Sequence, residues 1–186
     1  MPTVINGLPA HVLLIHVVIV LVPLAAVMLI ASAVWPAARA KLGFLTPAVA
    51  LVALAFVPIT TNAGHYLYDH LDFTNSSLRK HVSLGDDLLP WVIALFVVSA
   101  GVWVLHRRYD MPWRAAPSEP DQAEPRGAGG TGVLTQQRAA KQALPVWVTA
   151  LVAVAAIAVS VGTVIQLYRI GDSGAHAVWG GTLKNG

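Results

Sequence analysis

The 186-residue sequence contains no cysteine. Without thiols the chain cannot form disulfides, bind a metal through thiolates, hold an iron–sulfur cluster through cysteine, or attach haem covalently through a C-x-x-C-H motif. It also has no G-x-S-x-G, H-E-x-x-H or Walker motif, so a hydrolase is the least favoured class. These absences favour a protein that is not an enzyme by itself.

Charged residues are scarce as well. Only 11% of the chain is charged and 56% is hydrophobic, whereas globular proteins are roughly 25% charged. A water-soluble domain could not cover its surface with so few charges, but a protein surrounded by lipid does not need them. The formal net charge of +3 is too small to indicate a nucleic-acid partner. The composition therefore predicts a lipid bilayer as the main partner.

Long apolar runs support this interpretation. A spanning helix needs about 20 mostly apolar residues, and runs near that length cover about 12–35, 42–65, 88–106 and 144–168. Barrel strands would alternate over shorter segments. We therefore predict an all-α integral membrane four-helix bundle, with residues 1–186 forming one membrane domain. The first cation, Arg39, follows the first run, so we expect that run to be a retained span and not a cleaved signal.

The only long hydrophilic stretch, residues 107–143, is rich in proline and glycine, which predicts a flexible loop. Orientation follows from the lysines and arginines near the ends of the spans. The side that holds this loop has eight of them and the other side has four. We therefore predict a cytoplasmic loop and an N-out/C-out topology.

Histidines gather at the predicted outer end of the bundle. His16 lies five residues, roughly 7–8 Å, deeper than His11 along the first span. A histidine within a span is costly and usually has a partner, whereas histidines at the interface can simply anchor helix ends. Six of the seven histidines are at this end: His11, His16, His65, His70, His81 and His176.

Two carboxylates precede the third apolar run. Pro90 leaves the carbonyl of Asp86 without its usual helical donor, so this carbonyl lies beside the carboxylates of Asp86 and Asp87. Alternatively, the two acids only stabilise the first turns of the helix. A helix start at Asn75 would place both acids further inside.

Small residues recur at helical spacing in the fourth run, where they favour close packing between helices in lipid. We interpret them as a packing seam and not as a site. They are Thr149, Ala153, Ala156, Ser160 and Thr163.

Short motifs stand in order at the ends of the predicted helices. They are Leu8-Pro9-Ala10-His11 with His16 and Leu21-Val22-Pro23-Leu24, then Ala63-Gly64-His65 with His81 and Asp87, and the tail from Arg169 to Trp179. In this arrangement the chain resembles the domain of unknown function 2231 family over nearly its whole length outside the 107–143 loop. The resemblance implies a small bacterial cytoplasmic-membrane protein with four spans. Relatives joined to Rieske-type iron–sulfur domains point to a redox membrane partner.

Three functions remain open on this evidence. In the first, haem b binds at the outer leaflet between two imidazoles, His16 with His65 or His81, and serves electron transfer. In the second, His11, His65, His81 and Asp87 bind a divalent metal, zinc or copper. In the third, the bundle is a structural or assembly partner that binds no cofactor.

Overall fold

The computed structural model describes residues 4–5, 8–70, 75–109 and 144–179. The predicted 107–143 loop therefore lies outside the described residues, apart from its first three. Two short strands, each of two residues, pair antiparallel ahead of the first helix, with Val4 opposite Pro9. The elements are β1 (Val4–Ile5), β2 (Leu8–Pro9), α1 (Ala10–Val34), α2 (Pro36–Leu42), α3 (Leu45–Asp69), α4 (Ser76–Asp86), α5 (Leu88–Arg108) and α6 (Val146–Trp179).

Four helical units are long and apolar enough to cross a membrane. They are Ala10–Val34, Leu45–Asp69, Ser76–Arg108 and Val146–Trp179. At 1.5 Å per residue the shortest, of 25 residues, reaches about 37 Å, more than the roughly 30 Å of a hydrocarbon core. The prediction of a helical bundle is confirmed, with four helices that are long and apolar enough to span a membrane.

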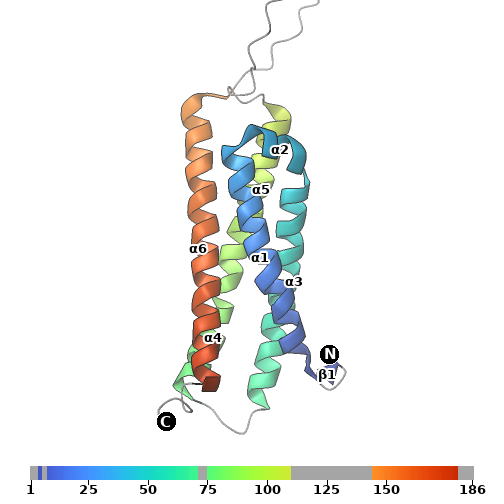
Figure 1. Cartoon of the computed structure of the whole chain (residues 1–186), viewed down its shortest axis with the longest axis vertical. Coiled ribbons are helices and arrows are strands. Elements are labelled where there is room, and N and C mark those ends of the chain that lie inside the picture. Colours follow the sequence, from blue (N-terminus) through green and yellow to red (C-terminus); the bar gives the residue numbers. More distant parts are fainter. Residues whose placement is uncertain (1–3, 6–7, 71–74, 110–143, 180–186) are drawn as a thin grey trace, which may run out of the picture.

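The long helices α1, α3, α5 and α6 run side by side along the bundle (Figure 1). Helix α1 packs against α3 and α6, and α5 completes the ring by packing against the same two helices. The short helix α2 lies at one end. Helix α1 begins and α6 ends at the opposite end, where α4 packs mainly against α6 (Figure 1). We call this opposite end the terminal end of the bundle.

The third helical unit begins well before its apolar run. The side-chain oxygen of Asn75 accepts a hydrogen bond from the backbone N–H of Leu78, so Asn75 caps α4 in the way that its side chain predicts. Helix α4 ends at Asp86 and α5 begins at Leu88. The break precedes Pro90, which cannot donate the next helical hydrogen bond.

Helix α6, the fourth predicted span, continues to Trp179, eleven residues beyond its predicted end at residue 168. Its polar extension stays helical because it packs along α4. The amide of Gln166 donates to the carbonyl of Leu84, and the amide of Asn75 donates to the carbonyl of Ala177. The length of the apolar run gave no sign that α6 also packs against α4.

The small-residue face of α6 is a packing seam, as predicted. Thr149, Ala156, Ser160 and Thr163 are all buried. The hydroxyl of Ser160 donates to the carbonyl of Ala26 on α1. The seam therefore brings two helix backbones close together, as small residues do in membrane bundles.

The prediction of orientation counted Arg39 as a cation in an aqueous loop, but the structure does not place it there. It is only 3% exposed, and its guanidinium donates to the carbonyls of Ser32 and Ala33 at the end of α1. A cation is favourable there because the last carbonyls of a helix carry partial negative charge. The short helix α2 turns the chain so that this contact forms.

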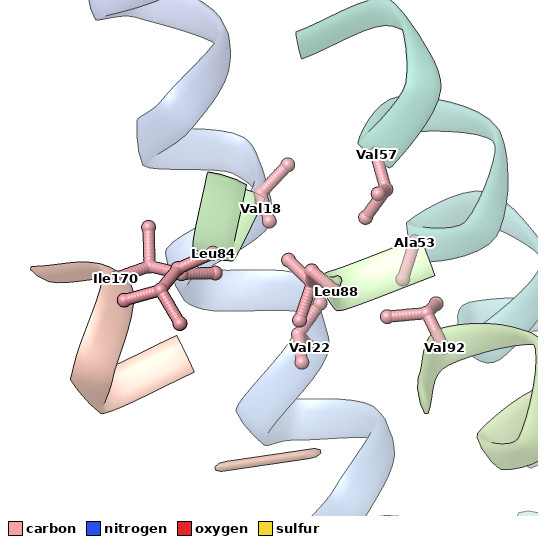
Figure 2. Close-up of a cluster of buried hydrophobic side chains, with 8 residues drawn as sticks. All are labelled: Val18, Val22, Ala53, Val57, Leu84, Leu88, Val92 and Ile170. Atoms are coloured by element: carbon pink, nitrogen blue, oxygen red, sulfur yellow. The ribbon is translucent and has the colours of Figure 1, made fainter. Parts of the chain in front are cut away.

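Two apolar clusters fill the bundle. The first joins α1, α3, α4, α5 and α6 and lies toward the terminal end (Figure 2). The second joins the other halves of α1, α3, α5 and α6. The residues in Figure 2 are Val18, Val22, Ala53, Val57, Leu84, Leu88, Val92 and Ile170.

Gly162 on α6 leaves room for the ring of Trp91 on α5. A Cβ at this position would lie 2.1 Å from Cζ3 of Trp91. We expect Gly162→Ala to lower the free energy of unfolding by about 1–3 kcal/mol, as overpacking does. Thermal unfolding in mild detergent measures the loss.

Gly101 provides a matched control in α5, because a Cβ there meets nothing within 4 Å. Gly101→Ala should leave stability unchanged or raise it by up to about 1 kcal/mol, since alanine favours helix. Equal melting temperatures for both variants would contradict this packing.

Candidate functional site

A cavity of about 510 Å³ opens at the terminal end of the bundle. Aliphatic side chains from α1, α3, α4 and α6 form most of its wall, and the apolar cluster of Figure 2 supplies its floor through Val18, Val57, Leu88 and Ile170. Three imidazoles also line it. We call this space the histidine cavity, and its polar residues are His11, His65, His81, Asp86, Thr60, Thr61 and Tyr68.

His11 reaches the cavity from the first turn of α1 and is held by α3. Its Nδ1 donates to the backbone carbonyl of Thr60, with 3.0 Å between nitrogen and oxygen. The ring lies directly over Gly64, where a Cβ would come within 2.9 Å of Cε1 of His11. The ring therefore occupies the place that a side chain at residue 64 would take.

His81 repeats this arrangement from α4 against α6. Its Nδ1 donates to the backbone carbonyl of Ile170 at 2.9 Å. The ring lies over Gly174, where a Cβ would be 3.1 Å from Cε1 and from Nδ1. The hydroxyl of Ser173 lies 3.4 Å from the same Nδ1 and donates to the same carbonyl.

The glycines are required by helix geometry. In each case the accepting carbonyl belongs to the residue four positions before the glycine. Because the Cα–Cβ bond of a helical residue tilts toward the N-terminus, a side chain at the glycine would cover that carbonyl. Only glycine leaves it open to an imidazole from a neighbouring helix.

These contacts fix the chemistry of both rings. A carbonyl oxygen can only accept, so Nδ1 of His11 and of His81 must each carry a proton. In the neutral ring the lone pair is then on Nε2, the nitrogen that binds metals when Nδ1 is held in this way. Both rings line the same cavity. This mostly apolar cavity therefore holds two imidazoles, each fixed in its tautomer by a backbone carbonyl.

His65 and Asp86 form a second polar feature on the cavity wall. Nε2 of His65 lies 2.8 Å from Oδ1 of Asp86, which joins α3 to the end of α4. Their side chains are 45% and 53% exposed, so the pair stands at the rim and not in the interior.

The other predicted ligands lie away from the cavity wall. His16 is exposed on α1, and its Nδ1 contacts the carbonyl of Val12 one turn earlier. Asp87 is exposed at the break between α4 and α5 and makes no side-chain cap. His70 and His176, which were not predicted as ligands, are also exposed and bond to carbonyls of their own helices.

Within the described ranges, no group of three or more histidines, cysteines, aspartates or glutamates is arranged to hold a metal ion. Of the four predicted metal ligands, His11, His65 and His81 line one cavity, where His11 and His81 each bond to a backbone carbonyl and His65 bonds to Asp86. Asp87 is exposed outside the cavity.

The sequence contained one signal that bears on the actual pairing. Gly64 and Gly174 mark the two places where an imidazole reaches a neighbouring backbone. Prediction ranked His16 above His11 by depth along the helix, but depth does not tell which way a ring points. The acceptors Thr60 and Ile170 gave no signal, because they act through their carbonyl groups.

Comparison with known proteins adds no relative. No family model matches the chain, and no curated protein or solved structure matches it either.

The His65–Asp86 pair should contribute little to stability. Exposed ion pairs typically contribute about 0–1 kcal/mol, so Asp86→Asn should lower the free energy of unfolding by less than about 1 kcal/mol. Gln166→Ala, which leaves the buried Leu84 carbonyl without this donor, should cost about 1–3 kcal/mol. Chemical unfolding of both variants in detergent measures the difference. An equal loss would identify the pair as structural.

Proposed function

We propose that the histidine cavity binds haem b, with Nε2 of His11 and Nε2 of His81 as its two axial ligands, and that the protein carries electrons in the membrane. One observation carries this proposal. Two imidazoles from different helices line the same apolar cavity. Nδ1 of His11 on α1 bonds to a carbonyl of α3, and Nδ1 of His81 on α4 bonds to a carbonyl of α6.

The number of ligands favours haem over a simple metal ion. Structural zinc needs four protein ligands and catalytic zinc needs three, whereas the described residues bring no three together. A porphyrin supplies four nitrogens itself, so two imidazoles are enough to complete the coordination of its iron. The donors that line the cavity therefore fit haem and fall short of a site for zinc or copper.

The cavity suits an apolar, planar group. Its volume of about 510 Å³ lies within the 300–1,000 Å³ of typical ligand pockets, which are mostly apolar with a few placed polar groups. Gly85 and Gly171 also line it, and a Cβ at either position would meet nothing within 4 Å. Neither glycine places a side chain in the cavity.

Two imidazole ligands would also define the type of chemistry. Haem proteins that bind or activate oxygen keep one axial position open, whereas filling both positions suits electron transfer. The sequence-based haem hypothesis placed the ligands at His16, His65 and His81. The present proposal keeps His81, replaces His16 by His11, and gives His65 a place at the rim.

Electron transfer also agrees with the motif resemblance described above. That resemblance supports a redox membrane protein or a Rieske-type protein as the partner, and the bacterial cytoplasmic membrane as the location. A folded protein that binds no haem would instead favour the structural or assembly role.

Removing either ligand should abolish the haem spectrum. We expect protein purified in mild detergent with added hemin to show the sharp visible bands of six-coordinate low-spin haem when reduced, and His11→Ala and His81→Ala to lose them. Gly64→Ala and Gly174→Ala should weaken haem binding by about 10–100-fold, as changes around a metal ligand do. Optical titration measures all four variants.

His70→Ala and His176→Ala are the matched controls, because both rings are exposed and bond only to their own helices. They should keep the full spectrum. A wild-type spectrum in His11→Ala, or its loss in His16→Ala alone, would contradict the assignment of the axial ligands.

The terminal end is proposed to face outward. Since the chain has no cysteine, single cysteines report topology directly. A membrane-impermeant maleimide should label Ser76→Cys in right-side-out spheroplasts, and should label Tyr109→Cys only after permeabilisation. The reverse pattern would place the histidine cavity at the cytoplasmic face.

A further inference from the structure

We propose that the His65–Asp86 pair at the rim of the histidine cavity is the docking and proton-accepting site for a lipid-soluble quinol that delivers electrons to the haem. This inference rests on the proposed haem site and names its electron donor. Neither residue serves as a haem ligand in that site.

The position of the pair connects it to the haem ligands. His65 follows Gly64, the residue over which the His11 ring lies. Asp86 lies at the end of α4, the helix that presents His81. Both residues line the same cavity as the two proposed ligands and are about half exposed. A molecule that contacts this pair therefore stands beside the edge of whatever fills the cavity.

The hydrogen bond prepares His65 to accept a proton. Asp86 is an acceptor when ionised, so Nε2 of His65 carries the proton of the 2.8 Å contact. In the neutral ring, Nδ1 then holds the lone pair. A carboxylate behind an imidazole fixes its tautomer and stabilises the imidazolium that forms. The pair thus has the arrangement of a general base and not of a metal ligand.

The surroundings select a lipid-soluble donor. The cavity that the pair borders is lined mostly by apolar or aromatic side chains, among them Leu67, Tyr68, Leu78 and Val82. The pair also sits at the end of helices that span the membrane by length and composition. A quinol combines an apolar ring with hydroxyl groups that must lose protons when it is oxidised, so it matches both features.

The reaction balances with two protein molecules. A quinol holds two electrons and two hydroxyl protons, whereas one haem iron accepts one electron. Two ferric proteins and one quinol therefore give two ferrous proteins, one quinone and two protons. Both O–H bonds break, each proton passes to Nδ1 of a neutral His65, and the half-exposed ring releases it to water.

Rapid mixing of the haem-loaded ferric protein with a short-chain benzoquinol tests the proposal. We expect the reduced haem band to appear about 10²–10⁴-fold more slowly in His65→Ala, the range for loss of a general base. Asp86→Asn should also be slower. The visible spectrum and reduction by dithionite should remain as in wild type, because the haem ligands are untouched.

His70 is exposed at the end of α3, five residues after His65. His70→Ala should therefore react with the quinol at the wild-type rate. Equal quinol rates in wild type and His65→Ala, or a wild-type protein that dithionite reduces but quinol does not, would overturn the proposal while leaving the haem site intact. A wild-type protein that binds no haem at all would instead overturn the proposed function, and this inference with it.

Discussion

The hydrogen bond from an imidazole Nδ1 to the backbone carbonyl of another helix determines how two histidine rings of the cavity are oriented and protonated. It occurs twice, from His11 to Thr60 and from His81 to Ile170. Each time it fixes a ring, settles its tautomer and leaves the lone pair of the neutral ring on Nε2. A lipid-embedded helix has few groups that can orient a polar side chain. A backbone carbonyl exposed by glycine provides one without adding a charge.

Hydrogen bonds from side chains to backbone carbonyls also satisfy other polar groups inside the apolar bundle. Buried polar atoms are costly in lipid unless they have a partner. In the described part of the chain, three of them bond to backbone carbonyls: Ser160 bonds to α1, Gln166 to α4, and Arg39 to the end of α1. The same groups tie the helices together, so packing and polar satisfaction support each other.

Four spans, a small-residue seam and a helix start at Asn75 could be predicted because each depends on local composition or spacing. The extension of α6 to Trp179 could not, because it depends on contacts with α4, about 90 residues earlier in the chain. Arg39 was counted as a loop cation, but the turn at α2 folds it onto α1.

The candidate site, like the fold, could be predicted from the sequence only in part. The gathering of histidines at one end followed from helix topology, and the structure places His11, His65 and His81 around one cavity there. Which rings enter the cavity depends on helix rotation, and apolar runs with no strong amphipathic face leave rotation undetermined. Glycine is the residue type that carried this information, since its position shows where one helix admits a side chain from another.

Electron paramagnetic resonance of the ferric, haem-loaded protein tests the central claim most directly, because its g-values report the axial ligands of the iron. Two neutral imidazoles should give a low-spin spectrum of the bis-histidine type in the wild-type protein. A high-spin signal of the kind that five-coordinate or water-ligated haem gives would contradict coordination by both His11 and His81. So would the absence of bound haem.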